Sequence, residues 1–301
     1  MDDAILSCAG SLCLWTSQGH EVTVLTVFTT CGEAPMPIKD LYVERRKNDI
    51  DALKYLPCSY QHLGFTDAPF RNKNFNSFAS ILFHHENIPE PFVEGLEDAL
   101  TKAIDCSNAD TIFFPLGIGG HIDHHIVYLL SLKYLNKKSI CYYEDLPYLF
   151  VPGWRKLRLK KLGIVQSADI DFSNSLSYNN EKETSQKKQN PNSLFSYGLK
   201  FIENYISNDL DAEESNRKYL NELKYLEEQN VHGNLASLIN LECISTNLNT
   251  SLFLNKCKLI LFYQTEWPTL FGNDANNIKA LLRENTSIDY SETFWQPKAS
   301  I

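Results

Sequence analysis

The stretch DTIFFPLGIGGHIDHH, residues 110–125, decides how the chain is expected to fold and where its chemistry lies. An apolar run of strand length leads into the glycine-rich turn GIGG, which is followed by three histidines and an aspartate. In an open α/β sheet, ligands bind outside the carboxyl ends of the strands, so this cluster is expected at a site. Because imidazole is a common metal ligand, the sequence predicts a metal site here.

Two histidines of the cluster suit this role by their spacing. His124 is expected to open the next helix, where its imidazole can reach a metal near the strand ends, and His121 can face the same cavity from the loop. Asp123 can hydrogen-bond an imidazole and fix its tautomer. The alternative is a helix cap at Asp123 flanked by surface histidines. The cluster does not name the metal.

Strands and helices alternate on both sides of this stretch. The runs of strand character are 21–30, 60–65, 110–116 and 139–146, and those of helical period are 1–20, 40–56, 90–106 and 124–135. This order predicts βαβ units and a parallel sheet that is covered by helices on both faces. The 301 residues suffice for one α/β domain with additions or for two small domains.

The second half of the chain shows a different pattern. Residues 173–193 are polar and rich in Asn, Ser and Lys, which predicts a flexible insertion. Residues 210–230 predict an amphipathic helix, and 258–264 fit a helix or a strand equally well. The basic run WRKLRLKK, 154–161, is interpreted as a solvated helix face.

Composition narrows the class of protein. The net charge of −9 and the lack of a basic stripe argue against a nucleic-acid-binding protein. No run of 18 apolar residues predicts a membrane span, and the acidic start is unlike a signal peptide. The eight cysteines form no C-x-x-C pair, so we expect buried thiols in a reduced, cytoplasmic compartment.

Asp2 and Asp3 are the second candidate group. As a helix cap and a first-turn acid they need no further role. If a strand preceded them, however, they would lie at its carboxyl end, where one acid can bind a metal while its neighbour acts as a general base. Catalytic zinc usually has three protein ligands and an open position for water. Asp3 and His124 supply two of the three.

The stretches DDAILSCAGSLCLWTSQGHEVTVLTVF and PLGIGGHIDHH resemble the LmbE/PIG-L family of zinc-dependent N-acetylglucosaminyl deacetylases. ERRKNDIDALKYL, HLGFTDAPFR, CYYEDLPY and FYQTEWPTLFG are similar to its bacterial branch. The resemblance implies a Rossmann-like, three-layer α/β/α sandwich with a mostly parallel sheet, formed by 1–301 as a single domain. Residues 1–150 would form the α/β core with the metal motifs, and 200–301 would complete the fold and the substrate cleft.

The resemblance also implies a role for each matching residue. Asp2 matches the general base, and Asp3 and His124 match metal ligands, with Zn²⁺ expected and Fe²⁺ as the alternative. His121 matches the histidine that stabilises the oxyanion, and Asp123 would orient it. The implied substrate is an N-acetylated amino sugar or a sugar conjugate.

Further residues are weaker candidates for substrate contact. Arg45 or Arg46 would meet a hydroxyl or phosphate group, although a surface role fits equally. Tyr143, with Tyr142 and Tyr148, would stack on sugar faces, although we expect at least one of the three tyrosines in the core.

The chain also departs from the family pattern. The first-motif histidine would fall two positions before Asp2, and the family's first strand is missing, so we expect an N-terminal segment to be absent. A chain without that strand should expose unpaired strand edges, bind zinc poorly and be less stable and less active than its relatives. Asn48 stands where the family often has Glu.

Three other functions compete with a deacetylase. The first is a non-catalytic, sugar-binding relative that has lost the metal. A two-metal phosphoesterase would need more bridging carboxylates than the sequence offers. A dinucleotide-binding protein would need G-x-G-x-x-G, which GIGGH is not. The sequence leaves the oligomeric state open.

Overall fold

The computed structural model describes residues 1–75, 78–82, 93–150, 154–164, 240–271, 274–284 and 291–298. The predicted insertion at 173–193 and the predicted helix at 210–230 lie outside these residues. All eight cysteines lie within them, and none forms a disulfide. Over the same ranges, no helix has both the length and the apolar character needed to cross a bilayer.

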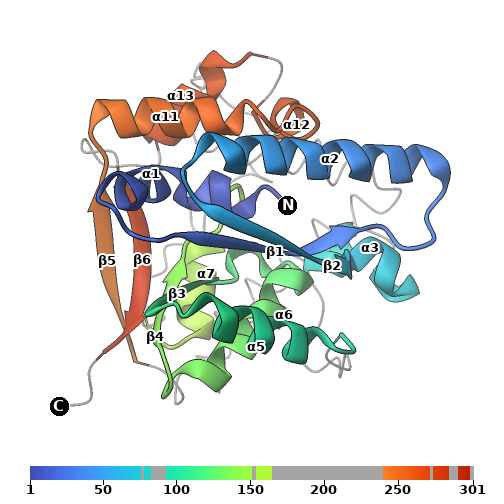
Figure 1. Cartoon of the computed structure of the whole chain (residues 1–301), viewed down its shortest axis with the longest axis horizontal. Coiled ribbons are helices and arrows are strands. Elements are labelled where there is room, and N and C mark those ends of the chain that lie inside the picture. Colours follow the sequence, from blue (N-terminus) through green and yellow to red (C-terminus); the bar gives the residue numbers. More distant parts are fainter. Residues whose placement is uncertain are drawn as a thin grey trace, which may run out of the picture.

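The first half of the chain alternates helices and strands, as the hydrophobic pattern predicts (Figure 1). Its strands are β1 (Thr23–Thr30), β2 (Ser59–Thr66), β3 (Thr111–Pro115) and β4 (Ser139–Tyr143). Its helices are α1 (Asp3–Ser17), α2 (Met36–Tyr55), α3 (Ala68–Arg71), α4 (Phe78–Leu82), α5 (Leu96–Ser107), α6 (Ile122–Ser131) and α7 (Trp154–Lys161). Single 3₁₀ turns lie at η1 (Lys73–Phe75), η2 (Ile118–Gly120), η3 (Leu132–Tyr134) and η4 (Tyr148–Phe150).

The C-terminal part adds two strands that the sequence pattern did not reveal. They are β5 (Leu241–Asn247) and β6 (Ser291–Pro297), and between them lie α11 (Thr250–Ile260), α12 (Trp267–Phe271) and α13 (Asn276–Glu284). The stretch 258–264, which fitted both a helix and a strand, is the end of α11 and the turn after it.

The strands form two separate sheets within the described residues. In the first, β1 pairs with β2 in parallel. The second has the order β3-β4-β6-β5, in which β3 and β4 are parallel and β6 runs antiparallel to both of its neighbours. The α/β fold with parallel strands is confirmed, and the antiparallel pair at one edge is an addition.

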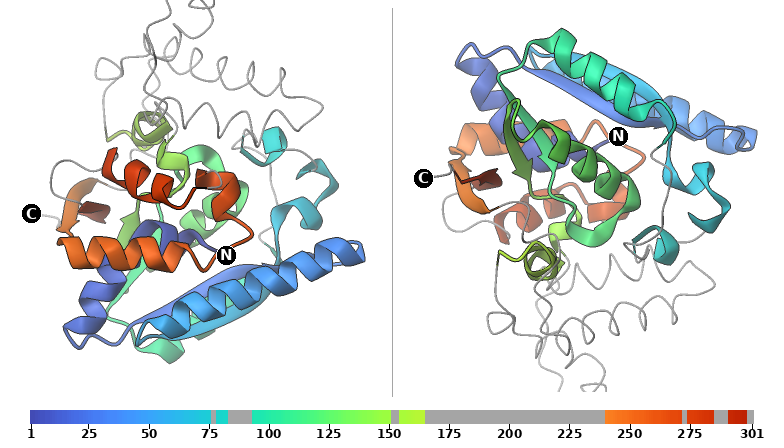
Figure 2. Two further views of the ribbon diagram at one scale, coloured as in Figure 1. Left: turned by 90° about the horizontal axis from the view of Figure 1, so that it is seen from above. Right: turned by 90° about the horizontal axis from the view of Figure 1, so that it is seen from below.

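Helices cover both faces of the larger sheet. Phe294 and Trp295 are neighbours on β6 but belong to different hydrophobic clusters, because successive side chains of a strand point to opposite faces. One cluster joins the sheet to α5, α6 and α7, and the other joins it to α1, α11 and α13. Figure 1 and Figure 2 show α1 and α11 side by side on one face, with α5 and α6 on the other. These are the three layers that the family resemblance implies.

A cavity of about 1950 Å³ extends between the two sheets. It is bordered by consecutive residues of both facing strands, 23–28 of β1 and 110–115 at β3, so the strand edges themselves line it. Within the described residues, each of these strands pairs on one side only. The facing edges of β1 and β3 are therefore unpaired in the part of the chain that the structure describes.

Helix α1 is fastened to the larger sheet by a buried ion pair. The carboxylate of Glu292 on β6 accepts hydrogen bonds from the main-chain N–H groups of Gly10 (2.9 Å) and Ser11 (2.7 Å). Lys256 of α11 donates to the same carboxylate at 2.6 Å and to the carbonyl oxygen of Ser7 at 3.0 Å. The helix that carries Asp2 and Asp3 at its start is therefore anchored to β6 and α11.

The basic run does not form a solvated helix face, so that interpretation was wrong. It forms the whole of α7, in which Arg158 and Lys160 are buried. The guanidinium of Arg158 lies 4.5 Å above the ring centre of Tyr128 and donates to the carbonyl oxygen of Leu116 at 2.7 Å. A cation–π contact and a charge-assisted hydrogen bond stabilise this cation inside the protein.

Candidate active site

The turn after β3 requires its glycines. Gly119 and Gly120 have φ values of 84° and 73°, a region that favours glycine. A Cβ atom on Gly119 would lie 2.5 Å from the ring of Tyr148, and one on Gly120 would lie 2.7 Å from the carbonyl oxygen of Leu82. The chain can therefore turn from β3 into α6 only through residues without a side chain, which places the histidines at the edge of the sheet.

His121 and His124 lie on the first turn of α6 and face the cavity. The Nδ1 atom of His121 accepts a hydrogen bond from the N–H of Asp123 at 3.2 Å, as an N-cap. Burial and the neighbouring His124 lower the pKa of His121 to about 3. A neutral ring with its Nδ1 lone pair engaged carries its proton on Nε2, so His121 can donate from that atom.

His124 lies between two carboxylates. Its Nδ1 is 2.7 Å from Oδ1 of Asp145, and its Nε2 is 3.1 Å from Oδ1 of Asp3. Burial alone would lower the pKa of His124, but the two carboxylates raise it well above the ordinary value. Burial alone would raise the pKa of Asp3, but His124 lowers it. The structure thus brings together two residues that lie far apart in the sequence.

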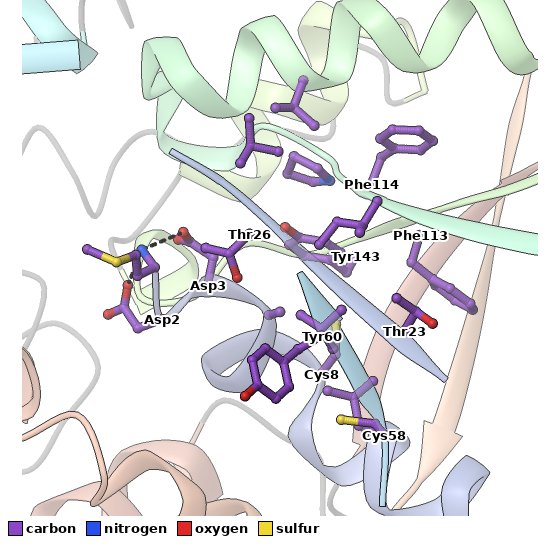
Figure 3. A pocket seen from close by; sticks show the side chains of 18 of the residues that line it. Asp2, Asp3, Cys8, Thr23, Thr26, Cys58, Tyr60, Phe113, Phe114 and Tyr143 are labelled. Carbon is purple, nitrogen blue, oxygen red and sulfur yellow. Dashed lines mark hydrogen bonds and ion pairs between the residues drawn. The ribbon is translucent and has the colours of Figure 1, made fainter. Parts of the chain in front are cut away.

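Asp2 lies beside Asp3 at the end of the cavity (Figure 3). Asp2 is the N-cap residue of α1 and Asp3 lies in the first turn, as the helix-cap alternative has it, but the Asp2 side chain makes no capping hydrogen bond. The Met1 nitrogen lies 3.5 Å from Oδ1 of Asp2 and 3.8 Å from Oδ2 of Asp3. Burial raises the pKa of Asp2, which makes its carboxylate a stronger base than an exposed one.

Asp123 contacts His121 through its main chain, and its carboxylate has other partners. Its two oxygens accept from Arg71 at 2.6 Å and from the N–H of Ala68 at 3.1 Å. Burial and the nearby Asp67 raise the pKa of Asp123 well above the ordinary value. The expectation that the Asp123 carboxylate orients His121 is thus replaced by an N–H contact, and Asp123 fastens α6 to α3.

The weaker substrate-binding candidates lie in different places. Arg45 lines the cavity, where its Nε atom is 2.9 Å from Glu266. Arg46 instead donates to the carbonyl oxygen of Thr29 at 2.9 Å. Tyr143 also lines the cavity, near Asp3 and Asp145, and burial raises its pKa well above the ordinary value.

The other two tyrosines divide between the core and the site. The buried Tyr142 accepts a hydrogen bond from Ser131 at 3.0 Å, as expected of a core residue. The Tyr148 ring packs edge-on against the His124 ring, with 5.5 Å between the ring centres. Tyr148 therefore forms part of the wall around the histidines.

Sequence reasoning gave no role to three acidic residues of this region, Asp67, Asp145 and Glu266, although all three lie in stretches that resemble the bacterial branch of the family. A further signal existed for two of them. Asp145 follows β4 and Asp67 follows β2, and the carboxyl ends of parallel strands lie at one edge of a sheet. Glu266 lies in the turn after α11, where no strand pattern could have placed it.

Asp3 and His124 fit two ligands of one metal ion. Because zinc binds nitrogen and oxygen ligands at about 2.0–2.2 Å, two donors of one zinc lie roughly 3–3.5 Å apart. The observed 3.1 Å agrees with this separation. In the part of the chain that the structure describes, no group of three or more His, Cys, Asp or Glu residues is arranged to hold a metal. The described residues therefore offer two of the three ligands expected for catalytic zinc.

Comparisons with known proteins agree with these observations. Residues 1–135 match the family model of PIG-L, described as GlcNAc-PI de-N-acetylase. The 2'-N-acetylparomamine deacetylase of Streptomyces fradiae is 30% identical over 187 residues. This match covers 57% of this chain and 64% of that relative, so the chain spans less than two thirds of the relative's length. The enzyme of the same name from Niallia circulans is 26% identical over 196 residues, which are 53% of this chain and 70% of that protein.

The fold likeness extends further along the chain. The solved zinc inhibited form of teicoplanin deacetylase Orf2 has a TM-score of 0.58 and 18% identity, and the match covers 98% of this chain and 94% of that one. The resemblance that the aspartate pair and the HIDHH motif carry is confirmed over residues 1–135.

Proposed function

Since residues 1–135 match the PIG-L family model, we propose that this chain is a metal-dependent N-deacetylase that removes an acetyl group from an amino sugar or a sugar conjugate. The observation that carries the proposal is the 3.1 Å approach of Asp3 to His124, with Asp2 and His121 beside them in one cavity. A buried carboxylate, a metal-binding pair and a neutral hydrogen-bond donor are the groups that hydrolysis of an amide needs.

Asp3 and His124 would hold the cation, which is zinc in our proposal, with ferrous iron as the alternative. When bound, the ion supplies a Lewis acid that polarises the amide carbonyl. Asp3 offers a carboxylate oxygen, and His124 offers Nε2, the ring atom that faces Asp3.

Asp2 acts as the general base in this proposal. Its carboxylate lines the cavity next to Asp3, so it can take a proton from a water molecule that attacks the acetyl carbonyl. A base is most effective when its pKa lies near the working pH, and burial shifts the pKa of Asp2 in that direction. The proton can then pass to the amine that leaves.

His121 donates the hydrogen bond that stabilises the oxyanion. Its Nδ1 is engaged by the N–H of Asp123, which leaves the Nε2–H free to point into the cavity. A donor that is oriented before the reaction stabilises developing negative charge without reorganisation. A neutral imidazole serves this purpose, in agreement with its lowered pKa.

The substrate that we propose is an N-acetylated amino sugar within a larger conjugate. Two of the proteins named above are a 2'-N-acetylparomamine deacetylase and a teicoplanin deacetylase, and these names support this class. Arg45 and Tyr143 line the same cavity as the reactive groups, and we propose them as contacts for the sugar. Nucleic acid is not among the proposed partners, and we propose a cytoplasmic enzyme.

The test is release of acetate from 2'-N-acetylparomamine and from N-acetylglucosamine conjugates. We expect release with added Zn²⁺ or Fe²⁺, loss of release with a chelator, and little release from Asp2→Asn with either metal. No release from any of these substrates by the metal-supplemented protein would contradict the proposal.

A non-catalytic, sugar-binding relative is the second candidate. It is favoured by the finding that the described residues supply two metal ligands and no group of three. Calorimetric binding of the same sugars, without acetate release under any metal condition, would establish it instead.

A further inference from the structure

We propose that Asp145 is a positioning residue, which fixes the ring of His124 so that Nε2 and the Asp3 carboxylate together form a cation site. The inference rests on the proposed function for the identity of the site. It concerns a residue to which neither the motif pattern nor the family resemblance assigned a role, and its role can be measured without substrate.

Asp145 is fully buried, and both of its carboxylate oxygens are used. Oδ1 lies 2.7 Å from Nδ1 of His124. Oδ2 accepts from the N–H groups of Gly117 at 2.8 Å and Ile118 at 2.9 Å. The one carboxylate thus holds both the histidine and the glycine turn that leads to it.

This contact determines which atom of the ring faces the cavity. A carboxylate accepts hydrogen bonds and does not donate them, so Nδ1 of His124 must carry a hydrogen. The lone pair of a neutral ring then lies on Nε2, which is 3.1 Å from an oxygen of Asp3. Two lone pairs at that distance repel each other unless a cation, either a proton or a metal ion, lies between them. Asp145 thereby makes the gap between Asp3 and His124 a site for positive charge.

The adjacent residue provides a contrast within the same turn. Glu144 is also buried, but its carboxylate faces another direction. It accepts from Nε of Arg155 at 2.7 Å and from Nε1 of Trp295 at 2.8 Å. Removal of the charge from Glu144 therefore changes a buried carboxylate one position away without altering a contact to His124.

An amide cannot replace the Asp145 carboxylate. Three N–H groups converge on its two oxygens, and Asn offers only one oxygen. In Asp145→Asn, the NH₂ group must face either the glycine turn or the ring of His124. Either orientation places donors against donors, and the ring loses its fixed tautomer or the turn loses its support.

The experiment compares Asp145→Asn with the matched control Glu144→Gln in the full chain. Zn²⁺ and Co²⁺ affinities are measured by competition with a chromophoric chelator, and the tautomer of His124 is read in the Zn²⁺-loaded protein from ¹⁵N imidazole shifts. We expect roughly a 10–100-fold loss of metal affinity and a changed tautomer in Asp145→Asn, because ligand-orienting partners have effects of this size. Glu144→Gln should keep both properties of the wild type.

Equal metal affinity and an unchanged tautomer in Asp145→Asn would overturn the proposal. If that variant does not fold, the wild-type spectrum decides, because an Nδ1 of His124 without a hydrogen contradicts the proposal directly. The deacetylase function is tested separately by acetate release. A wild-type protein with the expected tautomer but no acetate release would contradict the deacetylase function and leave the role of Asp145 intact.

Discussion

Oδ1 of Asp3 lies 3.1 Å from Nε2 of His124, although the two residues belong to helices far apart in the sequence. Two structural supports hold this approach in place. Glu292 and Lys256 fasten the helix of Asp3 to the larger sheet, and Asp145 orients the ring of His124. The approach of Asp3 to His124 therefore depends on residues that other elements contribute.

His121 should contribute to turnover more than to binding. If it donates to the oxyanion, His121→Ala should lower kcat by about 10²–10³ and leave KM nearly unchanged, as removal of one oxyanion donor does elsewhere. His20→Ala is the control, since His20 is exposed and follows the far end of α1. Acetate-release kinetics on both variants provide the measurement. A fall in kcat of less than threefold for His121→Ala would remove this residue from the mechanism.

The glycine turn should tolerate no Cβ atom. Gly119→Ala combines a left-handed backbone with a contact of 2.5 Å to Tyr148, so we expect a loss of unfolding free energy of about 3 kcal/mol or more. The matched control is Gly19→Ala, which has nearly the same φ, 85°, and nothing within 4 Å. It should lose only the backbone contribution, about 1–2 kcal/mol. Urea unfolding measures both values, and equal losses would show that the Tyr148 contact is unimportant.

Breaking the buried ion pair between Glu292 and Lys256 should lower the unfolding free energy strongly. Glu292→Gln leaves the charge of Lys256 buried without its partner, so we expect a loss of about 3–5 kcal/mol in unfolding free energy. The control is Asp51→Asn, which breaks the exposed pair with Lys47 on α2 and should change the free energy by less than about 1 kcal/mol. Similar effects of the two substitutions would contradict the anchoring role of Glu292.

Stability should depend on pH through Glu144. Burial raises the pKa of Glu144, so the folded state holds its proton at pH values where the unfolded chain has lost it. This contribution to stability is fully present below the ordinary Glu pKa of about 4.3 and is lost as the pH rises through the raised value. Relative to Glu144→Gln, the wild type should therefore lose unfolding free energy as the pH rises from the ordinary Glu pKa through the raised pKa of Glu144. Urea unfolding from pH 4 to 8 measures both proteins. If their unfolding free energies change with pH in the same way, the prediction is refuted.

The sequence predicted the parallel elements well because each is a continuous apolar run between turns. The strand TIFFP and the strand TVLTVFTT need no partner to be recognised. Strands β5 and β6 escaped notice because their residues mix polar and apolar types. They are recognisable mainly by their pairing with each other and with β4, which joins distant parts of the chain.

In the candidate site, too, the residues carried by local motifs were predicted, whereas contacts between distant parts of the chain were not. Asp2, Asp3, His121 and His124 were found because motifs carry them, and the structure brings them to one cavity. Local sequence did not reveal where the Asp123 carboxylate points, since that depends on Arg71 and on the N–H of Ala68. The buried Arg158 was misread for a similar reason, because its partners Tyr128 and Leu116 are contributed by other elements.

The walls of the cavity belong to two different sheets, and this division has a consequence for ligand binding. Asp3 and His124 are both tied to the larger sheet, whereas Arg45 comes from the helix that packs beside the smaller one. Contacts join the two sides of the cavity at more than one place: Arg71 to Asp123, Arg45 to Glu266 and Tyr263 to Asp49. A ligand in the cavity would therefore touch groups that are carried by both sheets.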